Sequence, residues 1–209
     1  MKKQRITIMK NKEIYEKYMN RFLEENSKVN LISQNEEKFL WEKHVFDSLG
    51  AELFFEKYTT NLQNKTLIDI GTGGGFPAIP LAIRYPELKI TALDSIRKKL
   101  TAIENITLDL KIENLSILHE RAENVKEKYD FITSRAVATL DKISTYALPL
   151  LKKDGYFIAY KSRKVDEEIE QAQSTIKRLG GEIVDIIKYQ LPLEEIYERN
   201  LVIIKKVQG

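Results

Sequence analysis

Cysteine is absent from this chain of 209 residues, and histidine occurs only twice. The absence of cysteine excludes a disulfide framework, a thiolate metal site and a cysteine nucleophile. The two histidines, His44 and His119, are too few and too far apart to suggest a zinc site, so we expect no bound metal.

Long apolar runs are also lacking. No stretch approaches the roughly 20 apolar residues that cross a membrane. The basic start of the chain, Met1–Arg5, is not followed by the continuous apolar segment of a signal peptide. We therefore expect a cytoplasmic protein that has no contact with membranes. The net charge of +3 permits a nucleic-acid partner without demanding one.

The length allows one domain with an extension. Residues 1–30 are rich in Lys and Arg and carry apolar residues at helical spacing, and residues 1–60 are expected to form an N-terminal helical cap. From 61 to 209 strand and helix patterns alternate, which predicts an α/β Rossmann-like domain with a mostly parallel sheet. Strands are expected near 66–70, 89–94, 115–118, 129–134, 155–160, 182–190 and 200–206, with the last two pairing as an antiparallel hairpin. Helices are expected near 78–85, 96–109, 140–151 and 166–179.

The most informative stretch is Leu67–Pro77, where an apolar run ends in a glycine cluster and a proline then opens a helix. Doubly wound α/β proteins use this order to bring backbone amides close to a ligand. A glycine cluster alone is most often a simple turn. Here Asp69 stands two places before Gly71, Gly73 follows, and Phe76 occupies the third small position of the dinucleotide fingerprint. This pattern resembles motif I of the S-adenosylmethionine-dependent methyltransferases.

Asp94 ends the next expected strand, 23 residues beyond Gly71. An acidic residue at this place can accept hydrogen bonds from both hydroxyls of a ribose. The alternative is a helix N-cap, because Asp94 and Ser95 precede a helix and both residue types cap well. The two roles are compatible, and with Asp69 and the glycines they predict a nucleotide site.

Polar residues follow the later strands at the edge where such sheets bind ligands. Glu123 is either near an adenine amino group or a surface carboxylate. Arg135 directly follows a buried strand, and we expect it to bind an anion, either a cofactor carboxylate or an RNA phosphate. Three cations after the fifth strand are either solvated or in contact with a polyanion: Lys161, Arg163 and Lys164. His44 is expected to be a hydrogen-bonded histidine in a helix interface, because no nucleophile lies near it in the sequence.

Taken together, these stretches resemble the glucose-inhibited division protein B family, the guanine-N7 methyltransferases of 16S ribosomal RNA. The matching segments lie in order over nearly the whole chain: Asn30–Ser33, His44–Ser48, Asp69–Pro77, Ile79–Ala82, Asp94–Ser95, Lys98, Arg121–Glu123, Ser134–Ala136 and Lys161. The chain departs mildly from the family pattern at four positions: Lys43, Ala78, Lys99 and Ser162.

The resemblance implies a class I methyltransferase fold with a seven-stranded sheet, S-adenosylmethionine as cofactor and S-adenosylhomocysteine as product. It implies 16S rRNA, within the small ribosomal subunit, as the partner. Nothing in the sequence suggests an obligate dimer, so we expect a monomer. The implied cofactor contacts are Gly71, Phe76, Ala122, Glu123 and Arg135, with Asp94 on the ribose and Asp69 and Gly73 completing the nucleotide site. Arg135 is the expected catalytic residue, and Lys161, Arg163 and Lys164 are the expected RNA contacts.

The chemistry agrees with this assignment. Guanine N7 carries an in-plane lone pair and no proton, so the enzyme needs to align the reactants and exclude water but requires no general base. The absence of cysteine disfavours cytosine-C5 methylation, which uses a thiol. Three alternatives stay open at this point: a small-molecule methyltransferase, an NAD-dependent oxidoreductase, and a non-catalytic rRNA-binding assembly factor.

Overall fold

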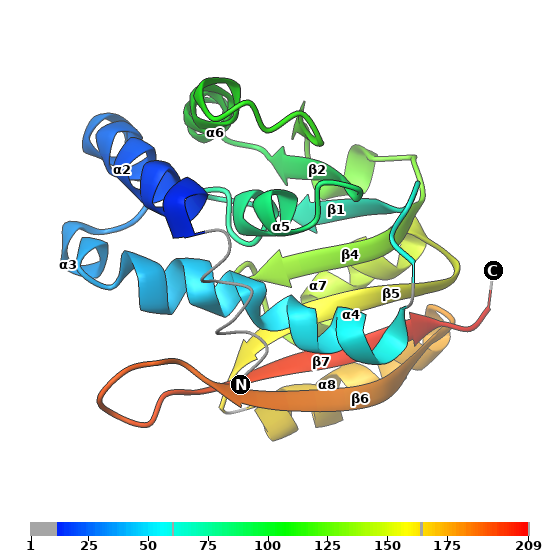
Figure 1. Ribbon diagram of the computed structural model, residues 1–209. Coiled ribbons are helices and arrows are strands. Elements are labelled where there is room, and N and C mark those ends of the chain that lie inside the picture. Colours follow the sequence, from blue (N-terminus) through cyan, green and yellow to red (C-terminus); the bar gives the residue numbers. More distant parts are fainter. Residues whose placement is uncertain (1–11, 60, 164, 209) are drawn as a thin grey trace.

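The computed structural model describes residues 12–59, 61–163 and 165–208. Within them, seven strands form one sheet in the order β3-β2-β1-β4-β5-β7-β6 (Figure 1). The strands are β1 (Thr66–Ile70), β2 (Lys89–Asp94), β3 (Leu115–His119), β4 (Tyr129–Arg135), β5 (Leu151–Ser162), β6 (Gly181–Gln190) and β7 (Glu198–Lys206). The first five pair in parallel, whereas β7 lies antiparallel between β5 and β6. The predicted α/β class and the antiparallel final hairpin are confirmed.

Helices cover both faces of the sheet. One face packs against α7 (Leu140–Ala147) and α8 (Val165–Arg178), and the other against α4 (Glu52–Tyr58), α5 (Ala78–Arg84) and α6 (Arg97–Asp109). In Figure 1, α4 and α5 lie in front of the sheet and α7 and α8 lie behind it. Among the described residues, none of these helices has the length and apolar character needed to cross a membrane.

The helix predicted over 140–151 is wrong at its end. The α-helix stops at Ala147, a 3-10 turn covers Leu148–Leu150, and Leu151 already begins β5. Pro149 explains the change, because proline has no backbone N–H with which to continue an α-helical ladder.

The N-terminal segment is helical, as expected, but the stretch after 34 is divided. The long helix α2 (Lys12–Val29) is followed by a short α3 (Gln34–Glu37), a π-helix (Leu40–Phe46), a 3-10 turn (Leu49–Ala51) and α4. The apolar face of α2 buries Tyr15, Tyr18 and Phe22, and the last two pack against Phe76 of the glycine turn. The helical segment therefore shares a core with the sheet domain, at the expected ligand loop. The basic residues before Lys12 lie outside the described residues.

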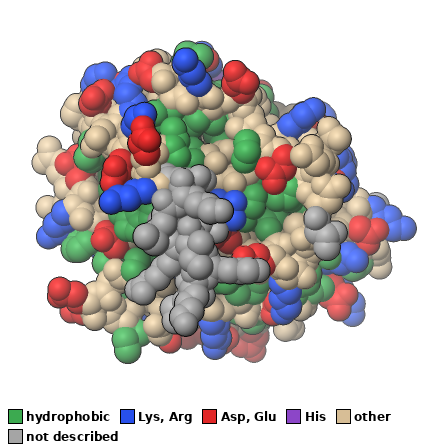
Figure 2. Space-filling view, in the orientation of Figure 1, with side chains coloured by type: hydrophobic (Ala, Val, Ile, Leu, Met, Phe, Trp, Pro, Cys, Tyr) green, Lys and Arg blue, Asp and Glu red, His purple; other side chains and the backbone are tan. Residues whose placement is uncertain are grey.

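Charges of both signs are interspersed over the face shown in Figure 2, without one extended patch of a single sign. This distribution agrees with the small net charge of +3. A net charge this small gives weak long-range attraction, so recognition of an anionic partner has to depend on local groups.

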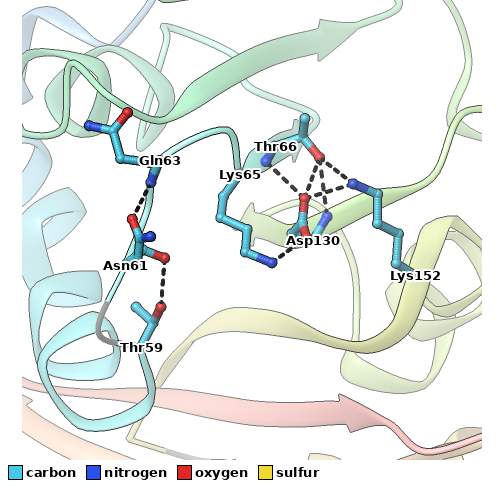
Figure 3. Close-up of polar contacts among 7 residues, drawn as sticks. All are labelled: Thr59, Asn61, Gln63, Lys65, Thr66, Asp130 and Lys152. Carbon is cyan, nitrogen blue, oxygen red and sulfur yellow. Dashed lines mark hydrogen bonds and ion pairs between the residues drawn. The ribbon is translucent and has the colours of Figure 1, made fainter.

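Asp130 ties three strands together at the edge of the sheet opposite the expected site (Figure 3). Its carboxylate accepts hydrogen bonds from the Nζ atoms of Lys65 (3.0 Å) and Lys152 (2.7 Å) and from the backbone N and Oγ1 of Thr66 (3.0 and 2.9 Å). Burial by itself raises the pKa of Asp130, but the two ammonium groups and Thr66 outweigh it and hold that pKa well below its usual range. The ionised carboxylate thus links the starts of β1, β4 and β5.

We expect Asp130→Asn to lower the free energy of unfolding by about 2 kcal/mol at pH 7, because hydrogen bonds to a charged group are lost. The folded pKa lies below the unfolded value of about 3.9, so this contribution is fully present above that value. It is lost as the pH falls through the folded pKa. Urea denaturation of both proteins at pH 7 and pH 3 measures the difference, which should shrink at pH 3.

Asp154→Asn is the matched control, because Asp154 is 65% exposed and, within the described part of the chain, contacts a single ammonium, that of Lys205. Its effect should stay within about 0.5 kcal/mol. Equal losses for the two variants would contradict the special role given to Asp130.

Candidate functional site

A cleft of about 1370 Å³ opens at the carboxyl ends of β1, β2, β4 and β5. Parallel sheets of this kind bind ligands at this edge. Most of the residues singled out from the sequence line it together: Gly71, Gly73, Phe76, Asp94, Ala122, Glu123, Arg135 and Lys161. Asp69 is fully buried beneath the cleft, and Arg163 is exposed beside it. Lys164 lies outside the described residues.

The glycine turn has the backbone conformation that the sequence pattern requires. Gly71 and Gly73 have φ angles of +70° and +57°, in the region that side chains disfavour. A Cβ at Gly71 would lie 2.5 Å from the side chain of Val137. The amides of Gly71 and Thr72 both donate to the carbonyl oxygen of Leu93, at 2.9 Å, which fixes the turn on β2.

Asp94 connects the turn to the chain after β2. Its Oδ2 accepts a hydrogen bond from the backbone N of Gly73 and its Oδ1 one from the backbone N of Ile96, each at 2.9 Å. The helix α6 starts at Arg97, so Ile96 occupies the N-cap position and the N-cap alternative for Asp94 is wrong. The carboxylate forms a local turn there instead, and its side chain faces the cleft.

Asp69, near the end of β1, is buried beneath the glycine turn. Its Oδ1 accepts a hydrogen bond from Thr133 Oγ1 at 2.9 Å, whereas Oδ2 is buried without a partner among the described residues. Burial raises the pKa of Asp69 to about 6, and the hydroxyls of Thr72 and Thr133 offset only part of that shift. A buried carboxylate with one free oxygen is well suited to a cationic ligand group or an ordered water.

Arg135 is held by the N-terminal segment. Its Nη1 donates to Asp47 Oδ2 at 2.9 Å and to the carbonyl oxygen of Lys43 at 3.0 Å, and its Nη2 lies 3.0 Å from His44 Nδ1. The guanidinium also lies over the ring of Phe76, at 5.2 Å from the centroid. The anion that the sequence led us to expect beside Arg135 is here a carboxylate of the chain itself.

His44 is a buried, hydrogen-bonded histidine, which confirms the interpretation made from the sequence. Because a guanidinium can only donate, His44 Nδ1 accepts and the ring proton resides on Nε2. Burial lowers the pKa of His44 to about 3, and the charge of Arg135 adds to the effect, so the ring is neutral. Nε2 has no hydrogen-bond partner among the described residues and lies 3.9 Å from Glu36 Oε2.

Sequence reasoning missed the partners of Asp47. Tyr189 of β6 donates to Asp47 Oδ1 at 2.7 Å, and the Nε of Arg199, at the start of β7, lies 3.4 Å from the same oxygen. Two signals were available: His44 and Asp47 stand at helical spacing on one face, and Arg199 directly precedes the apolar run of the last strand. Neither signal says that the two segments meet.

The expected RNA contacts differ in their surroundings. Lys161 is 10% exposed, and its Nζ donates to Glu168 Oε2 at 2.7 Å and to the carbonyl oxygen of Ala138 at 2.8 Å. Arg163 is exposed. Lys161 is thus part of an internal ion pair, whereas Arg163 is accessible to a partner.

We expect Asp47→Asn to lower the free energy of unfolding by about 2–4 kcal/mol, because two mostly buried guanidinium groups then lack a counter-charge. Tyr189→Phe removes a single donor and should cost about 1 kcal/mol. Urea denaturation measures both variants. A stability of Asp47→Asn equal to wild type would show that the carboxylate does not hold the two arginines.

Known proteins match this chain in sequence and in fold. The model of the family described as "GidB: rRNA small subunit methyltransferase G" matches residues 11–201. The chain is 42% identical over 200 residues to the ribosomal RNA small subunit methyltransferase G of Bacillus licheniformis, with 93% of this chain and 82% of that protein covered. The protein of the same name from Bacillus subtilis is 38% identical over 203 residues, with 94% and 83% covered.

Among solved structures, TYW2 of M. jannaschii in complex with AdoMet superposes with a TM-score of 0.58. The alignment covers 77% of each chain at 16% sequence identity. A likeness at this level shows the fold, which is that of the class I S-adenosylmethionine-dependent methyltransferases.

Proposed function

The chain belongs to the GidB family of rRNA small subunit methyltransferases, and from this membership we propose that it transfers the methyl group of S-adenosylmethionine to N7 of a guanine in 16S rRNA. The observation that carries the proposal is the family match over residues 11–201, which spans every residue that lines the cleft. S-adenosylmethionine supplies an electrophilic methyl group when bound, and S-adenosylhomocysteine is the product.

The residues of the cleft fit a nucleoside with cationic substituents. Gly71 and Gly73 lack the Cβ atoms that would fill the turn, and their positive φ angles expose backbone to the cleft. Asp94 offers carboxylate oxygens for ribose hydroxyls. Asp69 contributes a negative charge beneath the turn, and we propose that it favours a cationic ligand there. Ala122 and Glu123 form the wall after β3 and are proposed to contact the adenine.

We propose that Arg135 orients the target guanine. Its guanidinium is fixed by Asp47 and His44 at the floor of the cleft, where β4 ends. A fixed donor can bind guanine O6, the acceptor next to N7, and leave the N7 lone pair free. No proton has to be removed, which agrees with a site whose one histidine is neutral and acts as an acceptor towards Arg135.

The target is proposed to be an unpaired or distorted guanine in the small ribosomal subunit, because A-form RNA hides the edge that carries N7. Arg163 is proposed as an RNA contact, and Lys161 becomes one where its pair with Glu168 opens. We propose further that the protein acts as a monomer in the cytoplasm, with residues 1–60 as a cap beside the domain of residues 61–209.

Transfer of labelled methyl from S-adenosylmethionine to small subunits, purified from cells lacking the gene, tests the proposed function. Cleavage specific for 7-methylguanine then maps the label, and one labelled guanine is the expected result. If S-adenosylmethionine still binds but no label appears on particles or on naked rRNA, the result would favour the alternative of a small-molecule methyltransferase. Binding of rRNA without any transfer would instead indicate a non-catalytic assembly factor.

We expect Asp94→Ala to weaken S-adenosylmethionine binding by about 1.5–3 kcal/mol, through loss of charge-assisted hydrogen bonds to the ribose. Asp94→Asn keeps an oxygen that can accept from the amide of Gly73 and should lose less. Equilibrium dialysis with labelled cofactor measures both variants. Unchanged affinity of Asp94→Ala would remove this residue from the cofactor site.

We expect Arg135→Ala to lower the rate of methyl transfer by about 100-fold or more, because a fixed charge that positions the base is lost. Arg135→Lys keeps the charge but cannot reach Asp47 and His44 with two separate nitrogens, so it should be nearly as slow. Single-turnover methylation of small subunits gives the rates. Wild-type turnover in Arg135→Ala would mean that the arginine serves only the fold.

A further inference from the structure

Cations and aromatic rings alternate in a row that ends in the lining of the cleft. Lys38 Nζ lies 5.0 Å from the centroid of the Phe39 ring, and Lys43 Nζ lies 4.7 Å from the same centroid. Lys43 Nζ also lies 5.6 Å from the ring centroid of Tyr197, and the guanidinium carbon of Arg199 lies 4.7 Å from it. We call these five residues the cation–aromatic strip. Its members come from segments separated by about 150 residues of chain.

The strip leads into the site already described. Lys43, Tyr197 and Arg199 line the cleft together with Arg135. Arg199 shares the carboxylate of Asp47 with Arg135, so the inner end of the strip is fixed to the proposed catalytic arginine. The β6–β7 connection, which carries Tyr197, projects beyond the edge of the sheet in Figure 1.

The part of that connection next to β7 exposes apolar surface. Tyr197 is 37% exposed and its neighbour Ile196 is 79% exposed. Internal packing therefore leaves part of the Tyr197 ring uncovered. A ring that contacts two cations and is still partly exposed provides a surface on which a planar group can stack.

Charge decides which part of an RNA strand fits here. Three exposed carboxylates lie close to Tyr197 in the sequence: Glu194 and Glu195 on the same connection, and Glu198 at the start of β7. They repel phosphates, so the ring is suited to a base and not to the sugar–phosphate backbone. Lys43, whose Nζ lies 5.6 Å from the ring centroid, is suited to a phosphate.

We propose that Tyr197 stacks on an unpaired RNA base that flanks the target guanine, while Lys43 contacts a neighbouring phosphate. The inference rests on the proposed function, since it takes ribosomal RNA as the substrate. Single-stranded RNA is recognised through bases stacked on aromatic side chains and on arginine planes, and the strip supplies both. It also accounts for selection of an unpaired region, because a paired base cannot reach the ring.

Binding of a 16S rRNA transcript, measured by filter retention at several salt concentrations, tests the proposal. Tyr197→Ala should raise the Kd about 10-fold, as loss of one stacked base does, with an unchanged slope of log Kd against log salt. Lys43→Gln should lower that slope by about one unit. Tyr197→Phe keeps the ring and should bind like wild type.

Ile196→Ala is the matched control, because Ile196 is exposed on the same connection and carries no ring. Its Kd for the transcript should equal that of wild type. S-adenosylmethionine binding, measured for every variant, checks that the cleft is intact. Where Tyr197→Ala fails to bind the cofactor, Tyr197→Leu replaces it, since leucine keeps apolar volume but offers no aromatic face.

Equal Kd values for wild type and a cofactor-binding Tyr197→Ala or Tyr197→Leu protein would overturn the inference and leave the proposed function standing. An equal loss in Ile196→Ala would overturn it too, because the loop and not the ring would then be responsible. Wild-type protein that neither binds the transcript nor methylates small subunits would overturn the proposed function and the inference together.

Discussion

The carboxylate of Asp47 joins three parts of the molecule that are distant in sequence. It lies directly after the π-helix of the N-terminal segment, is 2% exposed, and is met by Arg135 of β4, Tyr189 of β6 and Arg199 of β7. A buried carboxylate is unfavourable unless charged or polar groups surround it, and here two guanidinium groups and a phenol do so. The cleft has its shape because these side chains must converge on one point. The position of Arg135, and with it the proposed placement of the guanine, follows from that convergence.

Phe76 has a similar role on the other side of the turn. It stands where a dinucleotide-binding loop has a small residue, and its ring lies between Phe22 of α2 and the pair formed by His44 and Arg135. Through the ring of Phe76, the N-terminal helices pack directly against the glycine turn. The helices are a wall of the cleft, and the arrangement of the site depends on them as much as on the sheet.

The sheet and the glycine turn could be predicted because their signals are local. The alternation of strand and helix patterns, the glycines and the position of Asp94 are all readable within a few tens of residues. The helix end at Ala147 has a weaker local signal, because apolar residues continue through Leu151 and Pro149 alone interrupts the helical ladder. The convergence on Asp47 and the pairing of Lys161 with Glu168 could not be predicted, because no local pattern says which distant charges meet. The second case matters for function, since an internally paired lysine and an exposed arginine look alike in a sequence.

The reversed direction of β7 brings the last part of the chain into the site. Because β7 runs antiparallel to β5, its first residues, and not its last, lie at the edge where the parallel strands end. Tyr197 and Arg199 therefore reach Lys43 and Asp47 although they follow every other cleft-lining residue in the chain. A protein without this hairpin would keep the glycine turn but would lose Tyr189 and Arg199, two of the three side chains that meet Asp47. Arg135 would then be the one cation left beside that carboxylate among the described residues.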